Sequence, residues 1–262
     1  MVLLHRAQQF FRAPHTIEQF HGAFKLSVLS REEADPAFGA SMHQLNLPDW
    51  AIERGRAMNY FPRIEPSRTA LIALDLQNAF MEQGQIFGNR HAREIVPNVN
   101  RLARTLRSAG GQVIWSRQTV SHVAPFACPA WQLDTGNPIV QAAIEALTEG
   151  NPGHRLHQDV AVEDTDMVLN KYRYSAFIRH SSDIEETLST HDIDTLIIAG
   201  TLTNVCCESS ARDAYMLGYR VLFASDATAA VTDAEHNAAL LNLALNFVDV
   251  RSTEDLVALI AA

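Results

Sequence analysis

From residue 69 onward, short apolar runs alternate with segments of helical periodicity. The runs are apolar on both faces, as in Thr69-Ala-Leu-Ile-Ala-Leu-Asp75, and this is typical of parallel strands that are covered by helices on both sides. The alternation therefore predicts an α/β fold with three layers, in which helices flank a mostly parallel, six-stranded sheet. Strands are expected at 69–75, 112–117, 166–171, 195–199, 220–225 and 246–251, and helices at 92–109, 138–149, 182–191, 204–217, 234–245 and 253–260.

Residues 1–66 form an N-terminal extension ahead of this predicted domain at 67–262. The extension is neutral, whereas the rest of the chain carries the whole net charge of −9, and it holds eight of the 20 aromatic residues. Disordered tails are usually poor in aromatic residues, so we expect the extension to pack on its own domain, on a neighbouring subunit or over the mouth of a site. Helices are expected within it at Ile17–Phe24 and Pro48–Met58.

Charge and cysteine content restrict the partners and the compartment. The acidic balance disfavours nucleic acid and anionic membrane surfaces as partners. No apolar run approaches the roughly 18–20 residues that a membrane span needs. Three cysteines, two of them adjacent, provide no disulfide framework, so we expect a cytoplasmic, reducing location.

Three reactive side chains are expected at the carboxyl ends of strands, where open α/β sheets place their sites. Asp75 and Lys171 end two of the predicted strands, and Cys206 follows a third. Thr203 and Asn204 are suitable helix N-caps, which would put Cys206 in the first turn of a helix. The positive end of the helix dipole favours a thiolate there, so Cys206 is a candidate nucleophile.

This set of residues suits acyl transfer from a substrate to water, without a metal or another cofactor. Asp75 would accept the thiol proton, and Lys171 would hold Asp75 in place by its charge. Each residue also has a simpler interpretation: a strand-end cap for Asp75, a solvated charge for Lys171 and an inert core thiol for Cys206. Cys207 is expected to be such a core thiol, on the opposite side of the helix.

The motifs around these residues resemble those of the isochorismatase-like cysteine hydrolases. The resemblance covers about residues 67–262 and combines Asp75-Leu-Gln-Asn-Ala-Phe80, the strand-end Lys171, and Gly200-Thr-Leu-Thr-Asn-Val-Cys206 followed by Glu208-Ser-Ser-Ala-Arg-Asp-Ala214. It implies the family's Rossmann-like fold and assembly into a homodimer or homotetramer.

The resemblance also implies specific roles. Asp75, Lys171 and Cys206 would form a catalytic triad. The peptide bond between Thr201 and Leu202 would be cis, and the backbone N–H groups of Leu202 and Cys206 would form the oxyanion hole.

Nicotinamidases of this family bind a metal through an Asp-x-His and a further His near the second strand. That region here reads Trp115-Ser-Arg-Gln-Thr-Val-Ser-His122 and lacks the Asp-x-His. His154 and His157 have the spacing of two ligands but no evident third. We therefore expect no metal and disfavour a nicotinamidase.

The stretch Lys171-Tyr-Arg-Tyr-Ser-Ala-Phe177 is most similar to the corresponding stretch of ureidoacrylate amidohydrolases. Arg117 and Arg173 are candidates for binding a substrate carboxylate, with surface ion pairs as the alternative. Other candidates for contact with substrate are Gln77, Phe80, Trp131, Tyr174 and Phe177, although loop hydrogen bonding for Gln77 and core packing for the aromatic residues explain them equally well.

The hypothesis that follows is an amidohydrolase that releases ammonia from a small amide or ureido (N-carbamoyl) compound. One alternative is a hydrolase of a vinyl ether of the isochorismatase type, in which Asp75 protonates the substrate and no thiol is needed. A second is a catalytically retired protein that serves as a binding module or scaffold.

Overall fold

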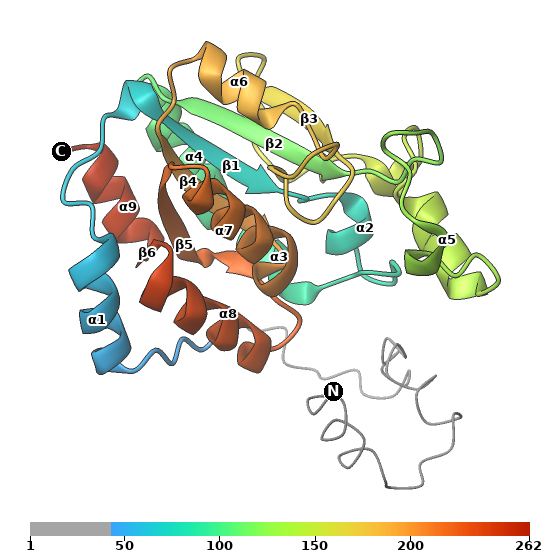
Figure 1. The fold of residues 1–262 in the computed structure, drawn as a ribbon, viewed down its shortest axis with the longest axis horizontal. Helices are drawn as coiled ribbons and strands as arrows, with labels where there is room; N and C mark the ends of the chain where they lie inside the picture. Colours follow the sequence, from blue (N-terminus) through green and yellow to red (C-terminus); the bar gives the residue numbers. More distant parts are fainter. Residues whose placement is uncertain (1–42) are drawn as a thin grey trace, which may run out of the picture. The chain divides into compact units, whose positions relative to one another are not determined.

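The computed structural model describes residues 43–262 and contains a six-stranded sheet in which every pair of neighbouring strands is parallel. The strand order is β3-β2-β1-β4-β5-β6, so β1 and β4 lie at the centre (Figure 1). The predicted α/β class and strand count are confirmed. The strands are β1 (Thr69–Leu74), β2 (Gln112–Gln118), β3 (Met167–Lys171), β4 (Thr195–Thr201), β5 (Arg220–Ala229) and β6 (Asp249–Arg251).

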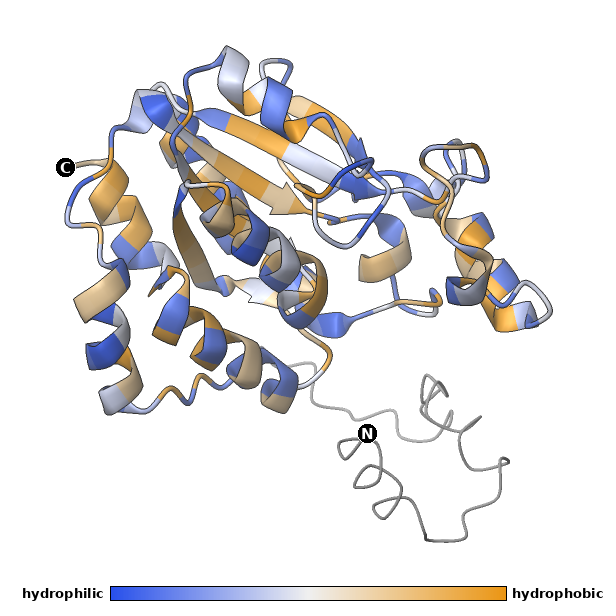
Figure 2. Cartoon of the chain, in the orientation of Figure 1, coloured by the Kyte–Doolittle hydropathy of each residue, from blue (hydrophilic) through white to orange (hydrophobic). Residues whose placement is uncertain are grey.

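Helices cover both faces of the sheet, which makes the three predicted layers (Figure 1). One apolar core joins the sheet to α4 (Val96–Ser108) and α9 (Thr253–Ile260). The other core joins it to α6 (Ile184–Thr190), α7 (Glu208–Met216) and α8 (Asp233–Asn246). All residues of β1 and β4 are buried, as expected for strands that are apolar on both faces. Figure 2 shows the central strands coloured mainly hydrophobic, whereas the helices carry hydrophilic residues as well.

The described part of the N-terminal extension packs on its own domain. Helix α1 (Asp49–Asn59) contains most of the predicted helix at Pro48–Met58 and lies against α8. A Cβ atom at Gly55 would stand 2.2 Å from the carbonyl oxygen of Ala244, so only glycine permits this approach. The helix predicted at Ile17–Phe24 lies outside the described residues.

Some element boundaries differ from the prediction for local reasons. The single helix expected at 92–109 is two helices, α3 (Arg90–Glu94) and α4, which meet at Ile95. Pro97 occupies the first turn of α4, where its missing N–H costs nothing. Helix α5 (Pro138–Ala146) ends earlier than expected, and the four-residue helix α2 (Asn78–Met81) has too few residues for a periodic signal. Within the described residues, no helix is long and apolar enough to cross a membrane.

Candidate active site

The three predicted catalytic residues come together at the carboxyl ends of three strands. Asp75 follows β1, Lys171 ends β3, and Cys206 lies in the turn after β4. Lys171 Nζ is 2.9 Å from Asp75 Oδ2 and 3.6 Å from Cys206 Sγ. Asp75 and Lys171 are fully buried, and Cys206 is 6% exposed. The simpler interpretation of Lys171 as a solvated surface charge is therefore wrong.

Asp75 is held by the neighbouring strand and by its own backbone conformation. Its φ of 56° lies in the left-handed region, which few residues other than glycine adopt, and Asp is among those that tolerate it. The N–H of Asp75 donates to the carbonyl of Ser116 (3.2 Å), and Ser116 Oγ donates to Asp75 Oδ1 (2.7 Å). One carboxylate oxygen thus faces Ser116 and the other faces Lys171.

Lys171 is surrounded by hydrogen-bond acceptors. Besides the carboxylate and the sulfur, Gln118 Oε1 and the carbonyl of Arg173 (2.9 Å) face the ammonium, so four acceptors share its three N–H donors. Burial lowers the pKa of Lys171, but the interactions with Asp75 and Cys206 outweigh this effect and leave the pKa raised above 10.5. Lys171 is consequently charged at neutral pH, and its charge lies directly beside the carboxyl group of Asp75.

The environment of Cys206 differs from the expectation in two respects. Residues Thr203–Cys207 form a π-helical turn, and neither Thr203 nor Asn204 caps a helix. Burial, only partly opposed by the charge of Lys171, raises the pKa of Cys206 to about 12. This direction disfavours the expected thiolate in the resting protein, and a base must take the proton when the thiol reacts.

The turn before Cys206 has the geometry that the resemblance implied. The peptide bond between Thr201 and Leu202 is cis. The N–H groups of Val205 and Cys207 both donate to the carbonyl of Leu202, and within the described residues the N–H of Leu202 itself has no hydrogen-bond acceptor. This N–H remains available to an oxyanion.

A buried histidine supports the same turn. His236 Nδ1 lies 2.9 Å from Thr203 Oγ1, and Nε2 lies 3.0 Å from the carbonyl of Ser225. Since a carbonyl only accepts, Nε2 carries the proton and Nδ1 accepts from the threonine hydroxyl. Burial lowers the pKa of His236 to about 4, so the ring is neutral and links α8 to the turn.

Cys207 lies in the apolar core between the sheet and α7, as expected, and is fully buried. Cys206 and Cys207 are both free thiols.

Three of the predicted substrate-binding side chains make contacts within the protein. The amide of Gln77 bonds backbone groups: Nε2 donates to the carbonyls of Gln118 and His154, and Oε1 accepts from the N–H of Gln118. Phe80 stacks on Phe87 in a small apolar cluster. Phe177 is 5% exposed and packs in the core beneath α6 and α7. These contacts match the simpler interpretations, and contact with a substrate stays a prediction for all three.

The two predicted arginines differ: Arg173 is occupied by backbone carbonyls, whereas the buried Nε of Arg117 has no hydrogen-bond partner among the described residues. Arg173 donates to the carbonyls of Phe126, Ala127 and Tyr172, so its guanidinium holds the loop after β2. Arg117 lies between Ser116 and Gln118 on β2, and side chains alternate along a strand, which turns Arg117 toward the opposite face.

The two remaining aromatic candidates are exposed. Trp131 is 82% exposed and Tyr174 is 64% exposed. Burial, together with the charges of Cys206 and Cys128, raises the pKa of Tyr174. Contact of Trp131 or Tyr174 with a substrate stays a prediction.

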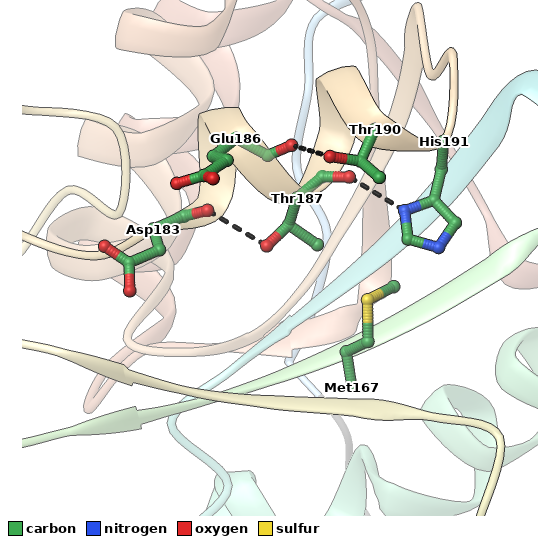
Figure 3. Close-up of a pocket in the computed structure, with 6 residues that line it drawn as sticks. All are labelled: Met167, Asp183, Glu186, Thr187, Thr190 and His191. Carbon is green, nitrogen blue, oxygen red and sulfur yellow. Dashed lines mark hydrogen bonds between the residues drawn. The ribbon is translucent and has the colours of Figure 1, made fainter.

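A surface pocket of about 270 Å³ lies under α6, away from the triad (Figure 3). Its hydrogen bonds stay within the helix: Thr187 and Thr190 donate to the carbonyls of Asp183 and Glu186, and His191 Nδ1 faces the carbonyl of Thr187. Its polar groups are thus used by α6 itself, and nothing in it suggests catalysis.

A second polar cluster joins the start of the described chain to the domain. His43, His91 and Asp233 bring three potential metal-ligand atoms within 4.8 Å of one another. Both nitrogens of His43 are already used, however: Nε2 accepts from the N–H of Ala230 (3.1 Å), and Nδ1 lies 2.7 Å from Asp233 Oδ1. The proton therefore sits on Nδ1, which offers Asp233 an N–H rather than a lone pair for a metal. These bonds attach His43 to Asp233 and Ala230, and the arrangement suits a structural contact better than a metal site.

Ser116, Gln118 and His236 were missed in the sequence. A signal existed for the first two: they are polar, two residues apart, and follow the apolar part of β2, so they share one face. His236 gives no local signal, because its partner Thr203 is 33 residues away.

Comparisons with known proteins agree with this geometry. The model of the isochorismatase domain matches residues 69–255. The chain is 30% identical over 234 residues to the ureidoacrylate amidohydrolase RutB of Pseudomonas savastanoi pv. phaseolicola, covering 82% of this chain and 94% of that protein. It is 30% identical to nicotinamidase 3 of Arabidopsis thaliana, covering 68% and 81%. The crystal structure of a cysteine hydrolase from Pseudomonas syringae pv. phaseolicola has a TM-score of 0.69 at 29% identity, covering 78% of this chain and 96% of that one. The chain therefore belongs to the isochorismatase family and is a hydrolase.

Proposed function

We propose that this hydrolase is a metal-independent cysteine amidohydrolase that cleaves the C–N bond of a small amide or ureido (N-carbamoyl) compound and releases ammonia. The observation that carries the proposal is the buried contact of Lys171 with both Asp75 (2.9 Å) and Cys206 (3.6 Å). The amidohydrolase relative, which spans nearly the whole domain, supports the same class of reaction.

The first half of the reaction forms a thioester. Asp75 accepts the proton of the Cys206 thiol as the sulfur attacks the carbonyl carbon of the substrate. This transfer is required because the pKa of Cys206 is raised to about 12. The N–H groups of Leu202 and Cys206 stabilise the oxyanion, and Asp75 then returns the proton to the departing nitrogen, so that ammonia leaves.

The second half hydrolyses the thioester. Asp75 takes a proton from water as the water attacks the thioester carbonyl, and the acid product leaves as the sulfur recovers a proton. Lys171 stays charged throughout and stabilises the ionised form of Asp75. Every proton transfer in the cycle thus uses one carboxylate.

Two choices within this proposal rest on the sequence between 115 and 122. This region lacks the Asp-x-His through which nicotinamidases of the family bind a metal. Its absence favours metal-independent chemistry and disfavours nicotinamide as the substrate. Activity that is unchanged after dialysis against EDTA is expected, and a loss that zinc restores would contradict metal independence.

We also propose a cytoplasmic homodimer or homotetramer, and size-exclusion chromatography with light scattering tests the assembly.

The test is an ammonia-release screen across primary amides, N-carbamoyl acids and ureido acids. Wild-type protein should release ammonia from at least one class, and acid-quenched samples should carry the acyl group on the Cys206 peptide by mass spectrometry. Cys206→Ala should abolish both signals, whereas the matched control Cys207→Ala should keep them.

The alternatives give different results in the same assays. Turnover of a vinyl ether that survives Cys206→Ala but is lost in Asp75→Asn would indicate the isochorismatase-type reaction. Absence of turnover and of any acyl adduct in a folded wild-type protein would indicate a retired scaffold.

A further inference from the structure

The first described residues, 43–46, are clamped onto helix α8. His43 Nδ1 lies 2.7 Å from Asp233 Oδ1, and the N–H of Asn46 donates to Asn237 Oδ1 at 2.7 Å. Asp233 and Asn237 are four residues apart on α8, so they lie on the same side of the helix. The clamped segment precedes the part of the chain that the family model matches, and it fixes the N-terminal extension to the domain.

The ring of His43 covers the histidine that supports the nucleophile turn. It stacks on the ring of His236, with centroids 4.2 Å apart and planes inclined by 13°, and it also contacts the ring of His91 at 4.1 Å. The side chain of His43 is only 4% exposed, and His236 is fully buried. His43 thus shields the ring whose Nδ1 accepts from the hydroxyl of Thr203, and water cannot compete easily for that bond.

His43 also reaches the turn through the backbone that follows β5. Its Nε2 accepts from the N–H of Ala230 at 3.1 Å. The carbonyl of the preceding residue, Ala229, accepts from Thr201 Oγ1 at 3.2 Å. Thr201 ends β4 and is followed by Leu202, whose N–H is a predicted oxyanion donor. The same ring is therefore linked to the residue before this donor and, through the stacked histidine, to the residue after it.

We propose that His43 is a positioning residue for catalysis: through His236 and Ala230, it holds the turn that carries Cys206 and the oxyanion donors. The N-terminal extension would then take part in the reaction without contacting the substrate. This inference rests on the proposed amidohydrolase function. Oxyanion donors act only when they are fixed where the charge develops, and a displacement of about 1 Å can lower a rate about 100-fold.

The bonds of His43 require a neutral ring. Nε2 accepts a backbone N–H and cannot carry a proton, while Nδ1 offers its own N–H to Asp233. The other titratable groups around the stack are His91, whose Nδ1 lies 2.8 Å from Glu94 Oε2, and His236. Burial, followed by the nearby His43, lowers the pKa of His236 to about 4. Removing the ring of His43 would admit water to His236 and raise that pKa.

The test compares wild-type protein with three variants. His43→Ala removes the ring, and His43→Gln keeps one acceptor and one donor on a flat amide group. The matched control Gln44→Ala changes the neighbouring side chain, which is exposed. Ammonia release gives kcat and KM with any compound that the wild-type protein hydrolyses. Circular dichroism checks the fold, and NMR titration of the imidazole signals gives the pKa of His236.

His43→Ala should lower kcat about 10–100-fold and change KM less than about twofold, because an interaction that matters only in the transition state is lost. His43→Gln should recover most of the lost kcat, and Gln44→Ala should match the wild type. The pKa of His236 should rise from about 4 toward 6.5 in His43→Ala. If His43→Ala does not fold, His43→Phe keeps a ring and loses both bonds, and it should lower kcat about 3–10-fold.

A folded His43→Ala protein with an unchanged kcat would overturn this proposal and leave the amidohydrolase function intact, and so would an unchanged kcat in His43→Phe. A loss that lies in KM would also overturn it, because His43 would then act on substrate binding. An unchanged pKa of His236 in His43→Ala would show that the ring does not shield the support of the turn. No ammonia from any compound in the screen would overturn both proposals.

Discussion

Lys171 Nζ and Asp75 Oδ2 form an ion pair 2.9 Å long in which both side chains have no exposed surface. The pair joins β3 to the end of β1 across the intervening strand β2. Charges that are removed from water carry a large desolvation cost, which only good geometry and further hydrogen bonds offset. Here Ser116 donates such a bond to Asp75, and Gln118 accepts one from Lys171.

Removing one partner of this pair should destabilise the fold. Lys171→Met leaves a buried carboxylate without a counter-charge and should lower the free energy of unfolding by about 3–5 kcal/mol. The double variant Asp75→Asn/Lys171→Met should lose less than the sum of the two single losses, because neither charge remains. Urea denaturation followed by circular dichroism measures all three. Additive losses would mean that the two groups do not interact.

Alkylation of Cys206 should report a protonated thiol in the resting protein. Only the thiolate reacts, and the pKa of Cys206 is raised to about 12 by burial. The rate with iodoacetamide should therefore be low at pH 7 and rise about tenfold per pH unit up to pH 10. Mass spectrometry of the Cys206 peptide follows the reaction. A rate that levels off near pH 7 would instead show that Cys206 is already a thiolate at neutral pH, as the sequence suggested.

Gly200→Ala should lower the free energy of unfolding more than a glycine-to-alanine substitution at which the new Cβ atom meets no neighbour. Gly200 has a φ of +113°, and a Cβ there would lie 2.1 Å from the carbonyl oxygen of Leu74 on the adjacent strand. Gly110 also has a positive φ, of +87°, but nothing lies within 4 Å of its Cβ position. Both variants lose roughly 1–2 kcal/mol to backbone strain, and Gly200→Ala should lose about 1–3 kcal/mol more from the clash. Equal losses in urea denaturation would show that β1 and β4 separate easily.

His236 should make the protein sensitive to acid. Its pKa is about 4 in the folded protein and 6.5 in the reference state, so the unfolded chain binds the proton more readily between these values. The stability that His236 contributes is present above pH 6.5 and is lost as the pH falls toward 4, by at most about 1.4 kcal/mol per pH unit. His236→Gln keeps a donor for Ser225 and an acceptor for Thr203 and should lose less stability over this range. Parallel pH dependence of the two proteins in urea denaturation would refute the assignment.

Particular residues show how far the sequence predicts the structure. The strand that ends at Asp75 and the strand that precedes Cys206 are recognisable because they are apolar on both faces, and their order along the chain implies a parallel sheet. Since the carboxyl ends of parallel strands meet at one edge, the meeting of Asp75, Lys171 and Cys206 also follows from the sequence. The break at Ile95 and the π-helical turn do not, because they depend on local hydrogen bonds that periodicity does not record.

By itself, the sequence determined the sheet, its layers and the three reactive residues at its edge, because these depend on hydrophobic pattern and chain order. Tertiary structure alone decided the environment of Cys206, since burial raises the pKa of its thiol. It also decided that Gln77 and Arg173 bond backbone carbonyls while Gln118 faces Lys171. These outcomes depend on which polar groups meet when distant segments pack, and no spacing along the chain records that.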